Sequence, residues 1–172
     1  MLSYKYFAYG SNLYLRRLRK RTPSASFIAV AQLRGHELRF HKVSRLDGSG
    51  KCDAFATGVS TDWVWGVVFE LPSAEKSQLD KAEGLGVGYE EKTVDVKTKT
   101  GSMSAFTYVA SSEAIRADVQ PFAWYKKYVM AGAIEHDLPL EYVDAIRAVA
   151  TSQDPDADRR RRHEQFLNRA PA

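Results

Sequence analysis

Phe7-Ala8-Tyr9-Gly10-Ser11-Asn12-Leu13 joins a predicted strand to a predicted helix through a glycine turn. The aromatic stretch from Tyr4 to Tyr9 favours a short strand, and Ser11 or Asn12 is a candidate cap for a helix that starts near Leu13. The first amides of a helix lack backbone partners, and glycine lets another group approach them closely. The turn can therefore hold a carboxylate or an oxyanion. Ordinary helix capping explains the same residues equally well.

Further strands are predicted on the C-terminal side of this turn. Strand-like runs extend from Phe27 to Leu33 and from Glu37 to Val43, and a loop with two glycines follows from Ser44 to Lys51. The continuous apolar run from Val64 to Leu71 indicates a buried strand. A hairpin around Thr100-Gly101 is predicted to pair Thr93–Lys97 with Ser104–Ala110.

Three helices are predicted between and after these strands. One is expected to start with Ser73 as its N-cap and to stop at Gly84, and two others are expected to start at Pro121 and Pro139. Antiparallel strands combined with a few helices indicate an α+β fold. We expect a small mixed or antiparallel β-barrel with helices packed outside it.

Length and composition indicate one globular domain. The chain has 172 residues, of which 44% are hydrophobic and 27% charged. We expect this domain to span residues 1–150 and a polar, arginine-rich tail to span residues 151–172. No apolar run is long enough to cross a membrane, the N-terminus does not resemble a signal peptide, and there is one cysteine. These features predict a cytoplasmic protein without a membrane partner.

The net charge of +4 is mild, and much of the excess lies in two clusters, Arg16–Arg21 and Arg159–Arg162. Basic clusters can mark nucleic-acid sites. Here we favour a solvated helix face and a frayed tail, because acidic residues are interspersed in the tail and no nucleic-acid motif is present. We therefore expect no nucleic-acid partner. Phe166 and Leu167 are predicted to dock on the body of the protein or on a second subunit, so a homodimer is conceivable.

The remaining reactive residue types show no metal or nucleophile pattern. The four histidines have no ligand spacing, so no metal is predicted. Cys52 lacks an evident cysteine–histidine motif, which makes a nucleophilic role a minor alternative.

Five stretches, in order along the chain, resemble the gamma-glutamylcyclotransferase-like superfamily. Tyr9-Gly10-Ser11-Asn12-Leu13 resembles its hallmark turn, and Gly66–Leu71 resembles its central strand. The other three stretches are Leu79–Gly84, Gly88-Tyr89, and the pair of C-terminal helices with Tyr125-Lys126-Lys127, Gly132-Ala133 and Leu138–Tyr142. Together they cover about residues 6–146. Five motifs in order are specific for the superfamily and less specific for the substrate.

The resemblance implies a cofactor-free enzyme that acts on a small gamma-glutamyl substrate. Such an enzyme cyclises the glutamyl group to 5-oxoproline and releases the amine. Glu83 matches the catalytic acid/base position, and its expected place in the last turn of a helix would favour proton uptake, because the helix dipole disfavours negative charge there. The resemblance also implies substrate-binding roles for the turn residues, Tyr9, Gly10, Ser11, Asn12 and Leu13, and for Tyr89 and Tyr125.

Several alternatives stay open at this stage. Cys52-Asp53-Ala54-Phe55 departs from the family pattern after the glycine loop, which leaves the substrate undetermined. The same fold can act on a different gamma-glutamyl amide, or it can serve as a binding protein without turnover. Asp80, Glu90 and Glu91 are the other carboxylates near Glu83, and structural or solvated roles are the simpler interpretations for them.

Overall fold

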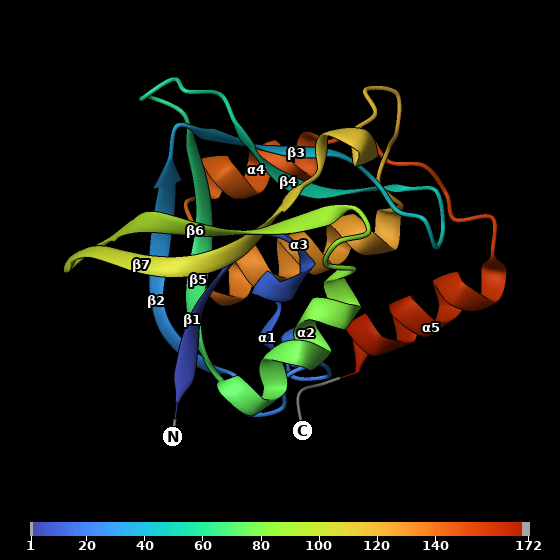
Figure 1. Cartoon of the computed structure of the whole chain (residues 1–172). Helices are drawn as coiled ribbons and strands as arrows, with labels where there is room; N and C mark the ends of the chain where they lie inside the picture. The colour runs from blue at the N-terminus through green and yellow to red at the C-terminus, as the bar shows by residue number, and fades with distance from the viewer. Residues whose placement is uncertain (1, 170–172) are drawn as a thin grey trace.

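The computed structural model describes residues 2–169 and contains a closed barrel of five strands. The strands follow the order β1 (Ser3–Ala8), β5 (Trp63–Pro72), β2 (Ser26–Arg34), β6 (Tyr89–Thr98) and β7 (Gly101–Ala110). Neighbours are antiparallel except where β1 meets β7 in a parallel contact that closes the barrel. The predicted α+β fold with a mixed barrel is confirmed (Figure 1).

A separate two-stranded sheet extends from one end of the barrel. Its strands are β3 (His36–Val43) and β4 (Gly50–Ala56), which pair antiparallel. The sequence analysis assigned the first two residues of β4, Gly50 and Lys51, to a glycine loop. The loop between the strands is shorter than predicted, because residues from Gly50 onward pair with β3.

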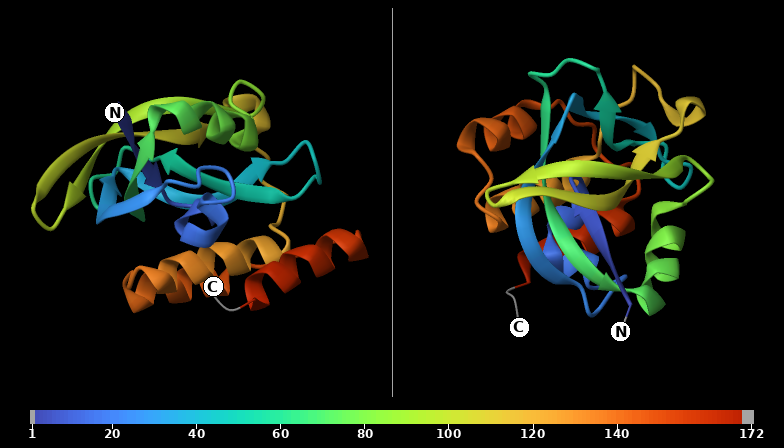
Figure 2. Two further views of the ribbon diagram at one scale, coloured as in Figure 1. Left: turned by 90° about the horizontal axis from the view of Figure 1, so that it is seen from below. Right: turned by 60° about the vertical axis from the view of Figure 1, so that its left-hand side comes forward.

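The helices lie on two sides of the barrel. The short helices η1 (Ser11–Leu13) and α1 (Leu15–Leu18) follow β1, and η2 (Ser73–Glu75) leads into α2 (Lys76–Glu83). After the barrel come η3 (Ser112–Ala114), α3 (Ala123–Glu135), α4 (Leu140–Ala148) and α5 (Ala157–Asn168). The left panel of Figure 2 shows α3 and α5 in one layer and α2 on the opposite side of the strands. Within residues 2–169, no helix is long and apolar enough to cross a membrane.

Two details of the helix starts differ from the sequence predictions. Neither Ser11 nor Asn12 caps a helix through its side chain, because both belong to η1, and Ser73 likewise makes no capping hydrogen bond. The stop at Gly84 is as predicted: its left-handed backbone, with φ of 71°, ends α2.

The segment after residue 150 is not a frayed tail. Residues 157–168 form α5, whose side chains dock on α3 and α1: the ring of His163 stacks on Trp124, with centroids 3.7 Å apart, and Phe166 packs against Tyr128. Asp154 is 1% exposed and accepts hydrogen bonds from the Trp124 indole and from Arg159. Phe166 thus docks on the body of the same chain, one of the two sequence-based alternatives. The boundary at residue 150 stays a prediction.

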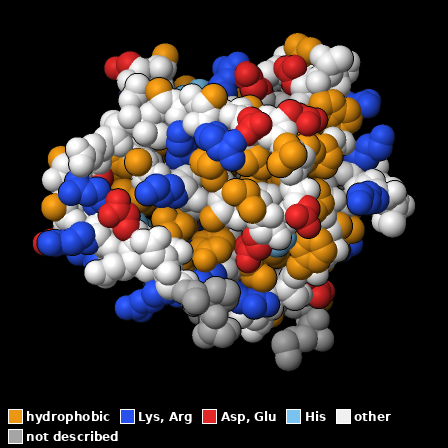
Figure 3. Space-filling view, turned by 180° about the vertical axis from the view of Figure 1, so that it is seen from behind, with side chains coloured by type: hydrophobic (Ala, Val, Ile, Leu, Met, Phe, Trp, Pro, Cys, Tyr) orange, Lys and Arg blue, Asp and Glu red, His pale blue; other side chains and the backbone are white. Residues whose placement is uncertain are grey.

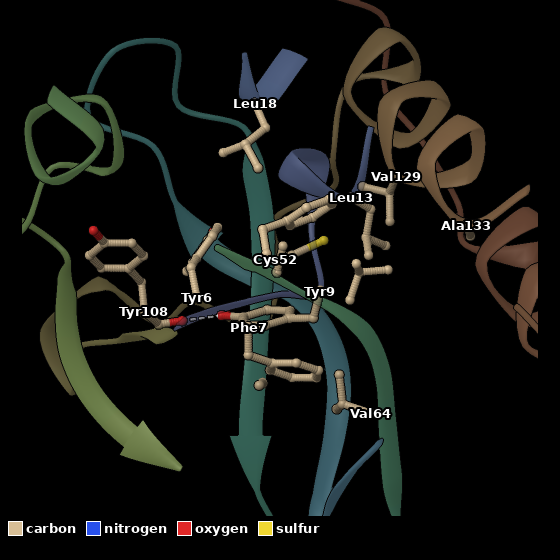
Figure 4. Packing of buried hydrophobic residues seen from close by; sticks show 14 of the residues in the cluster. Tyr6, Phe7, Tyr9, Leu13, Leu18, Cys52, Val64, Tyr108, Val129 and Ala133 are labelled. Atoms are coloured by element: carbon tan, nitrogen blue, oxygen red, sulfur yellow. Dashed lines mark hydrogen bonds between the residues drawn. The ribbon is translucent and has the colours of Figure 1, made fainter. Parts of the chain in front are cut away.

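The core extends from the barrel interior to α3. Figure 4 shows Tyr6 and Tyr108 on one side of Phe7, and Leu13 and Val129 on the other, with Cys52 between Tyr9 and Leu13. All of these side chains are buried. On the surface seen in Figure 3, acidic and basic side chains are interspersed with hydrophobic ones, so that face carries no extended area of a single charge.

Candidate active site

The turn after β1 packs directly against α3. A Cβ on Gly132 would lie 2.3 Å from the Tyr14 amide nitrogen and 2.4 Å from Leu13, so only glycine allows α3 to approach the turn this closely. Leu13 is 0% exposed and belongs to this contact. The prediction that Leu13 binds substrate is therefore corrected: its side chain supports the turn from the core.

The amides of this turn differ in their hydrogen bonding. The Leu13 amide donates to the Gly10 carbonyl at 3.0 Å. Among residues 2–169, no acceptor in the protein is found for the amides of Gly10, Ser11 and Asn12. The turn can thus offer hydrogen-bond donors to a bound group, as one of the two sequence-based interpretations required.

Glu83 is the last residue of α2, and its side chain is 16% exposed. One carboxylate oxygen accepts from Arg21 at 2.6 Å and from the Asn12 amide group at 2.9 Å. Arg21 also donates to Asn12 Oδ1 at 2.6 Å, and Asn12 Nδ2 donates to the Tyr6 hydroxyl at 3.0 Å. The sequence prediction placed Glu83 in the last turn of a helix but did not include the ion pair, because Arg21 is 62 residues away along the chain.

Two tyrosine hydroxyls are fixed by the backbone of one residue in β4. The Tyr89 hydroxyl donates to the Cys52 carbonyl at 2.6 Å, and the Cys52 amide donates to the Tyr125 hydroxyl at 3.1 Å. Burial raises the pKa of both tyrosines well above the usual value, so the hydroxyls stay protonated. A Cβ on Gly10 would lie 3.0 Å from Cys52 Cβ and 3.5 Å from the Tyr125 hydroxyl, which leaves little free space between turn and strand.

The Cys52 thiol itself is buried, and burial raises its pKa. A thiol in this state is a poor nucleophile. Tyr9 is also turned inward, where its hydroxyl donates to the Tyr108 carbonyl. Tyr108 in turn donates to Asp80 at 2.5 Å, and Asp80 pairs with Lys76. These contacts hold α2 against the barrel and so position Glu83.

These groups surround an inner cavity of about 20 Å³. Its walls come from β1, the turn, β4, the end of α2 and the tyrosines: Tyr6, Tyr9, Gly10, Ser11, Asn12, Cys52, Glu83, Tyr89, Tyr108 and Tyr125. Of the site residues predicted from sequence, only Leu13 is absent from this wall. Tyr6, Tyr108 and Cys52 were not predicted; the alternation along β1 that directs Tyr6 inward is the one sequence signal for them.

A larger space, the outer cleft, adjoins the inner cavity and has a volume of about 540 Å³. Ser11, Glu83, Tyr89 and Tyr125 line both spaces. The other walls of the outer cleft come from α1 and the segment after it, the β3–β4 hairpin, the end of α2, α3 and α5. Seven of the side chains that line it are Lys or Arg, and two are acidic.

Comparison with known proteins supports the resemblance found in the sequence. Residues 63–146 match the AIG2-like family. The chain is 35% identical to a gamma-glutamylcyclotransferase of Homo sapiens over 151 residues, which is 86% of this chain and 79% of the relative. It is 36% identical to the gamma-glutamylcyclotransferase of Bos taurus over 156 residues, with the same coverage. A solved gamma-glutamyl cyclotransferase structure superposes with a TM-score of 0.86 at 31% identity, covering 98% of this chain and 100% of that one.

The closed barrel, the glycine turn and the partly buried Glu83 carboxylate together form a candidate active site around the inner cavity. With identities above 30% over most of both chains, the chain belongs to the gamma-glutamylcyclotransferase family of enzymes.

Proposed function

We propose that the protein converts a gamma-glutamyl amino acid or amine to 5-oxoproline and the free amine, with Glu83 as general acid and base. One observation carries this proposal. The Glu83 carboxylate reaches the same inner cavity as the hydrogen-bond donors of the turn and the two buried tyrosines. A base and a set of donors around one small space are the groups that an acyl transfer requires.

The reaction is an internal aminolysis. The neutral α-amine of the glutamyl group attacks its own γ-carbonyl carbon and forms a five-membered ring. The attacking nitrogen gives a proton to Glu83, and Glu83 gives that proton to the leaving nitrogen as the carbon–nitrogen bond breaks. Because the reacting groups are already tethered, holding the folded conformer removes much of the entropic cost of the step. One carbon–nitrogen bond forms and another breaks without a change of oxidation state, and Glu83 transfers the proton, so the proposed reaction requires no cofactor.

Arg21 and Asn12 have a positioning role in this scheme. Both donate to one carboxylate oxygen of Glu83, Oε1, which leaves the second oxygen free of protein donors among the described residues. A carboxylate fixed through one oxygen can exchange a proton through the other. The turn amides of Gly10, Ser11 and Asn12 are the proposed partners of the oxyanion or of the substrate carboxylate.

The size of the two spaces constrains how substrate binds. A cavity of about 20 Å³ is close to the volume needed for one water molecule, so it cannot hold a whole glutamyl group. The reacting carbonyl and amine would enter the inner cavity, and the remainder of the substrate would occupy the outer cleft. Glu83, which lines both, lies at the junction. The proposed setting of this activity is the cytoplasm.

Isotope labelling tests the reaction type directly. The enzyme is incubated in H₂¹⁸O with gamma-glutamyl-alanine that carries ¹⁵N at the glutamyl α-amine, and the products are identified by mass spectrometry. Cyclisation yields ¹⁵N-labelled 5-oxoproline and alanine without incorporated ¹⁸O. Hydrolysis would instead yield glutamate containing ¹⁸O, and that result would overturn the proposed function.

A further inference from the structure

Asp53 is a buried carboxylate that the proposed reaction does not use. The residue is 2% exposed and lies in β4 directly after Cys52, which lines the inner cavity. One carboxylate oxygen accepts from the Ala110 amide at 2.8 Å, and the other pairs with His41 Nε2 at 2.8 Å. Asp53 thus links β4 to the end of β7 and to β3. Because a buried carboxylate is costly without such partners, these contacts hold it in one place.

His41 belongs to a β-bulge in the β3–β4 ladder. The register changes by one residue between Arg39 and Lys42, so that two residues of β3, one of them His41, oppose Cys52 alone. The side chain of His41 is 13% exposed, and its ring nitrogen reaches the Asp53 carboxylate. Bulges of this kind redirect a side chain locally. Here the bulge lies opposite the one residue of β4 that forms part of the cavity wall.

Asp53 is connected to both partners of one hydrogen bond in the inner cavity. The Tyr89 hydroxyl donates to the Cys52 carbonyl at 2.6 Å, and that carbonyl belongs to the peptide group between Cys52 and Asp53. On the donor side, Tyr89 pairs with Ala110 across β6 and β7, and the Ala110 amide donates to Asp53. The carboxylate therefore connects the peptide group that accepts this hydrogen bond to the strand pair that carries its donor.

This hydrogen bond determines what the Tyr89 hydroxyl can offer to a bound group. Since the hydroxyl donates its proton to the Cys52 carbonyl, its oxygen is left as an acceptor. Tyr89 and Glu83 both line the inner cavity. In the proposed cyclisation, an acceptor near the general base can hold an N–H of the attacking amine and so orient its lone pair towards the γ-carbonyl carbon.

Tyr125 provides a comparison on the other side of Cys52. Its hydroxyl accepts from the Cys52 amide at 3.1 Å, and that amide belongs to the preceding peptide group, between Lys51 and Cys52. Within residues 2–169, no hydrogen bond joins the Asp53 carboxylate to this peptide group. Loss of the carboxylate should therefore displace the Tyr89 hydroxyl more than the Tyr125 hydroxyl.

We propose that Asp53, together with His41, is a positioning residue of the reaction. The pair fixes the Cys52 carbonyl relative to β6 and β7, and the carbonyl in turn fixes the Tyr89 hydroxyl in the inner cavity. Neither His41 nor Asp53 lines the inner cavity or the outer cleft, so their effect on turnover passes through other residues. This inference rests on the proposed cyclisation and adds two residues that do not touch the substrate.

Two double-mutant cycles test whether Asp53 acts through the Tyr89 hydroxyl. The quantities measured are kcat and KM for 5-oxoproline release from gamma-glutamyl-alanine, well below the thermal midpoint of each variant. We expect Asp53→Ala alone to lower kcat by about 10-fold, as for residues coupled through shared contacts, and to change KM less. In a Tyr89→Phe background the same substitution should lower kcat by less than about twofold. In a Tyr125→Phe background the loss of about 10-fold should persist.

Asp95→Ala is the control for removal of a carboxylate, because Asp95 is exposed on β6 and lines neither space. Its kcat should equal that of the wild type. If circular dichroism shows that Asp53→Ala does not fold, His41→Ala takes its place in both cycles, since it removes one partner of the carboxylate and leaves the Ala110 contact. The expected loss in kcat is then about threefold, with the same dependence on Tyr89.

A folded cleaving variant, Asp53→Ala or His41→Ala, with wild-type kcat would overturn the inference and leave the proposed function in place. So would equal losses in the Tyr89→Phe and Tyr125→Phe backgrounds, because these would indicate a general loss of structure. Failure of the wild-type enzyme to release 5-oxoproline would overturn the proposed function and the inference with it.

Discussion

The inner cavity and the outer cleft share four residues but differ in volume and in charge. The inner cavity holds about 20 Å³, and its one charged lining side chain, Glu83, is neutralised by Arg21. The outer cleft holds about 540 Å³ and is lined by seven basic and two acidic side chains. In the proposed function, this difference corresponds to a division of roles: the reacting groups occupy the inner cavity, and the remainder of the substrate occupies the outer cleft.

The largest expected effect concerns the inner cavity. Glu83→Gln should lower 5-oxoproline release by about 10²–10⁴-fold, because the amide keeps the shape of the side chain and cannot take up the proton. Substrate affinity should change far less, since the rest of the outer cleft is retained. The measurement is kcat with gamma-glutamyl-alanine, together with circular dichroism to verify folding.

Glu90→Gln is the control for this variant, because Glu90 is an exposed carboxylate on β6 that does not line the inner cavity. We expect its activity to equal that of the wild type. An equal loss in both variants would mean that the general base has been assigned to the wrong carboxylate.

The next largest effect concerns the wall of the outer cleft. Asp154→Ala removes the acceptor of the Trp124 indole and of Arg159, whose bonds to Asp154 measure 2.8 Å and 2.7 Å. We expect the free energy of unfolding to fall by about 1.5–3 kcal/mol, as for buried hydrogen bonds to a charged group. Urea denaturation followed by fluorescence measures this loss.

Asp158→Ala provides the comparison, because Asp158 lies in α5 and Asp154 just before it. Asp158 pairs with Arg161 on the exposed face of α5, and exposed ion pairs contribute about 0–1 kcal/mol. If the two variants were equally stable, α5 would not be anchored through Asp154. The contacts of α5 predict that deleting residues 153–172 exposes Trp124 and opens the outer cleft.

A smaller effect on folding stability is expected from a change in pH. Burial, followed by the charges of Arg17 and Lys51, lowers the pKa of His163 to about 4 from its usual 6.5. The stability that neutral His163 contributes is therefore fully present above pH 6.5 and is lost as the pH falls from 6.5 towards 4. Because the ring is half exposed, solvent screening reduces this contribution to on the order of 1 kcal/mol.

His163→Phe keeps an aromatic ring against Trp124 and cannot be protonated. At pH 7 the variant should be slightly less stable than the wild type, because it loses the 3.1 Å contact with the Tyr128 hydroxyl. At pH 5 the difference in thermal midpoint should narrow. A difference that is the same at both pH values would contradict the assigned role of His163.

The inner cavity and the outer cleft also differ in how much of each could be predicted from the sequence. The inner cavity is built largely from the residues of short motifs at strand and helix ends, such as Gly10 and Glu83, where local sequence constrains local structure. The outer cleft brings together cations from separate segments. Nothing near Lys42 in the sequence indicates that its ammonium is buried over Tyr89, because the ring belongs to a strand 47 residues further on.

Two structural features were missed for the same reason. Strand β4 contains Asp53, a residue that strands disfavour, and its carboxylate accepts hydrogen bonds from His41, 12 residues away, and from the Ala110 amide, 57 residues away. Helix α5 has few apolar residues. Its docking depends on the hydrogen bond that the Trp124 indole donates to Asp154, a residue 30 positions away in the sequence. Local patterns predicted the barrel, whereas the long-range pairing of polar groups had to come from the structure.

The most direct test of this division of roles is a crystal structure of Glu83→Gln with gamma-glutamyl-glutamate bound. We predict that the γ-carbonyl oxygen lies within hydrogen-bond distance of the amides of Gly10 to Asn12, and that the leaving glutamate lies in the outer cleft. A substrate bound in the opposite direction, with the leaving group in the inner cavity and the glutamyl group in the outer cleft, would contradict the account.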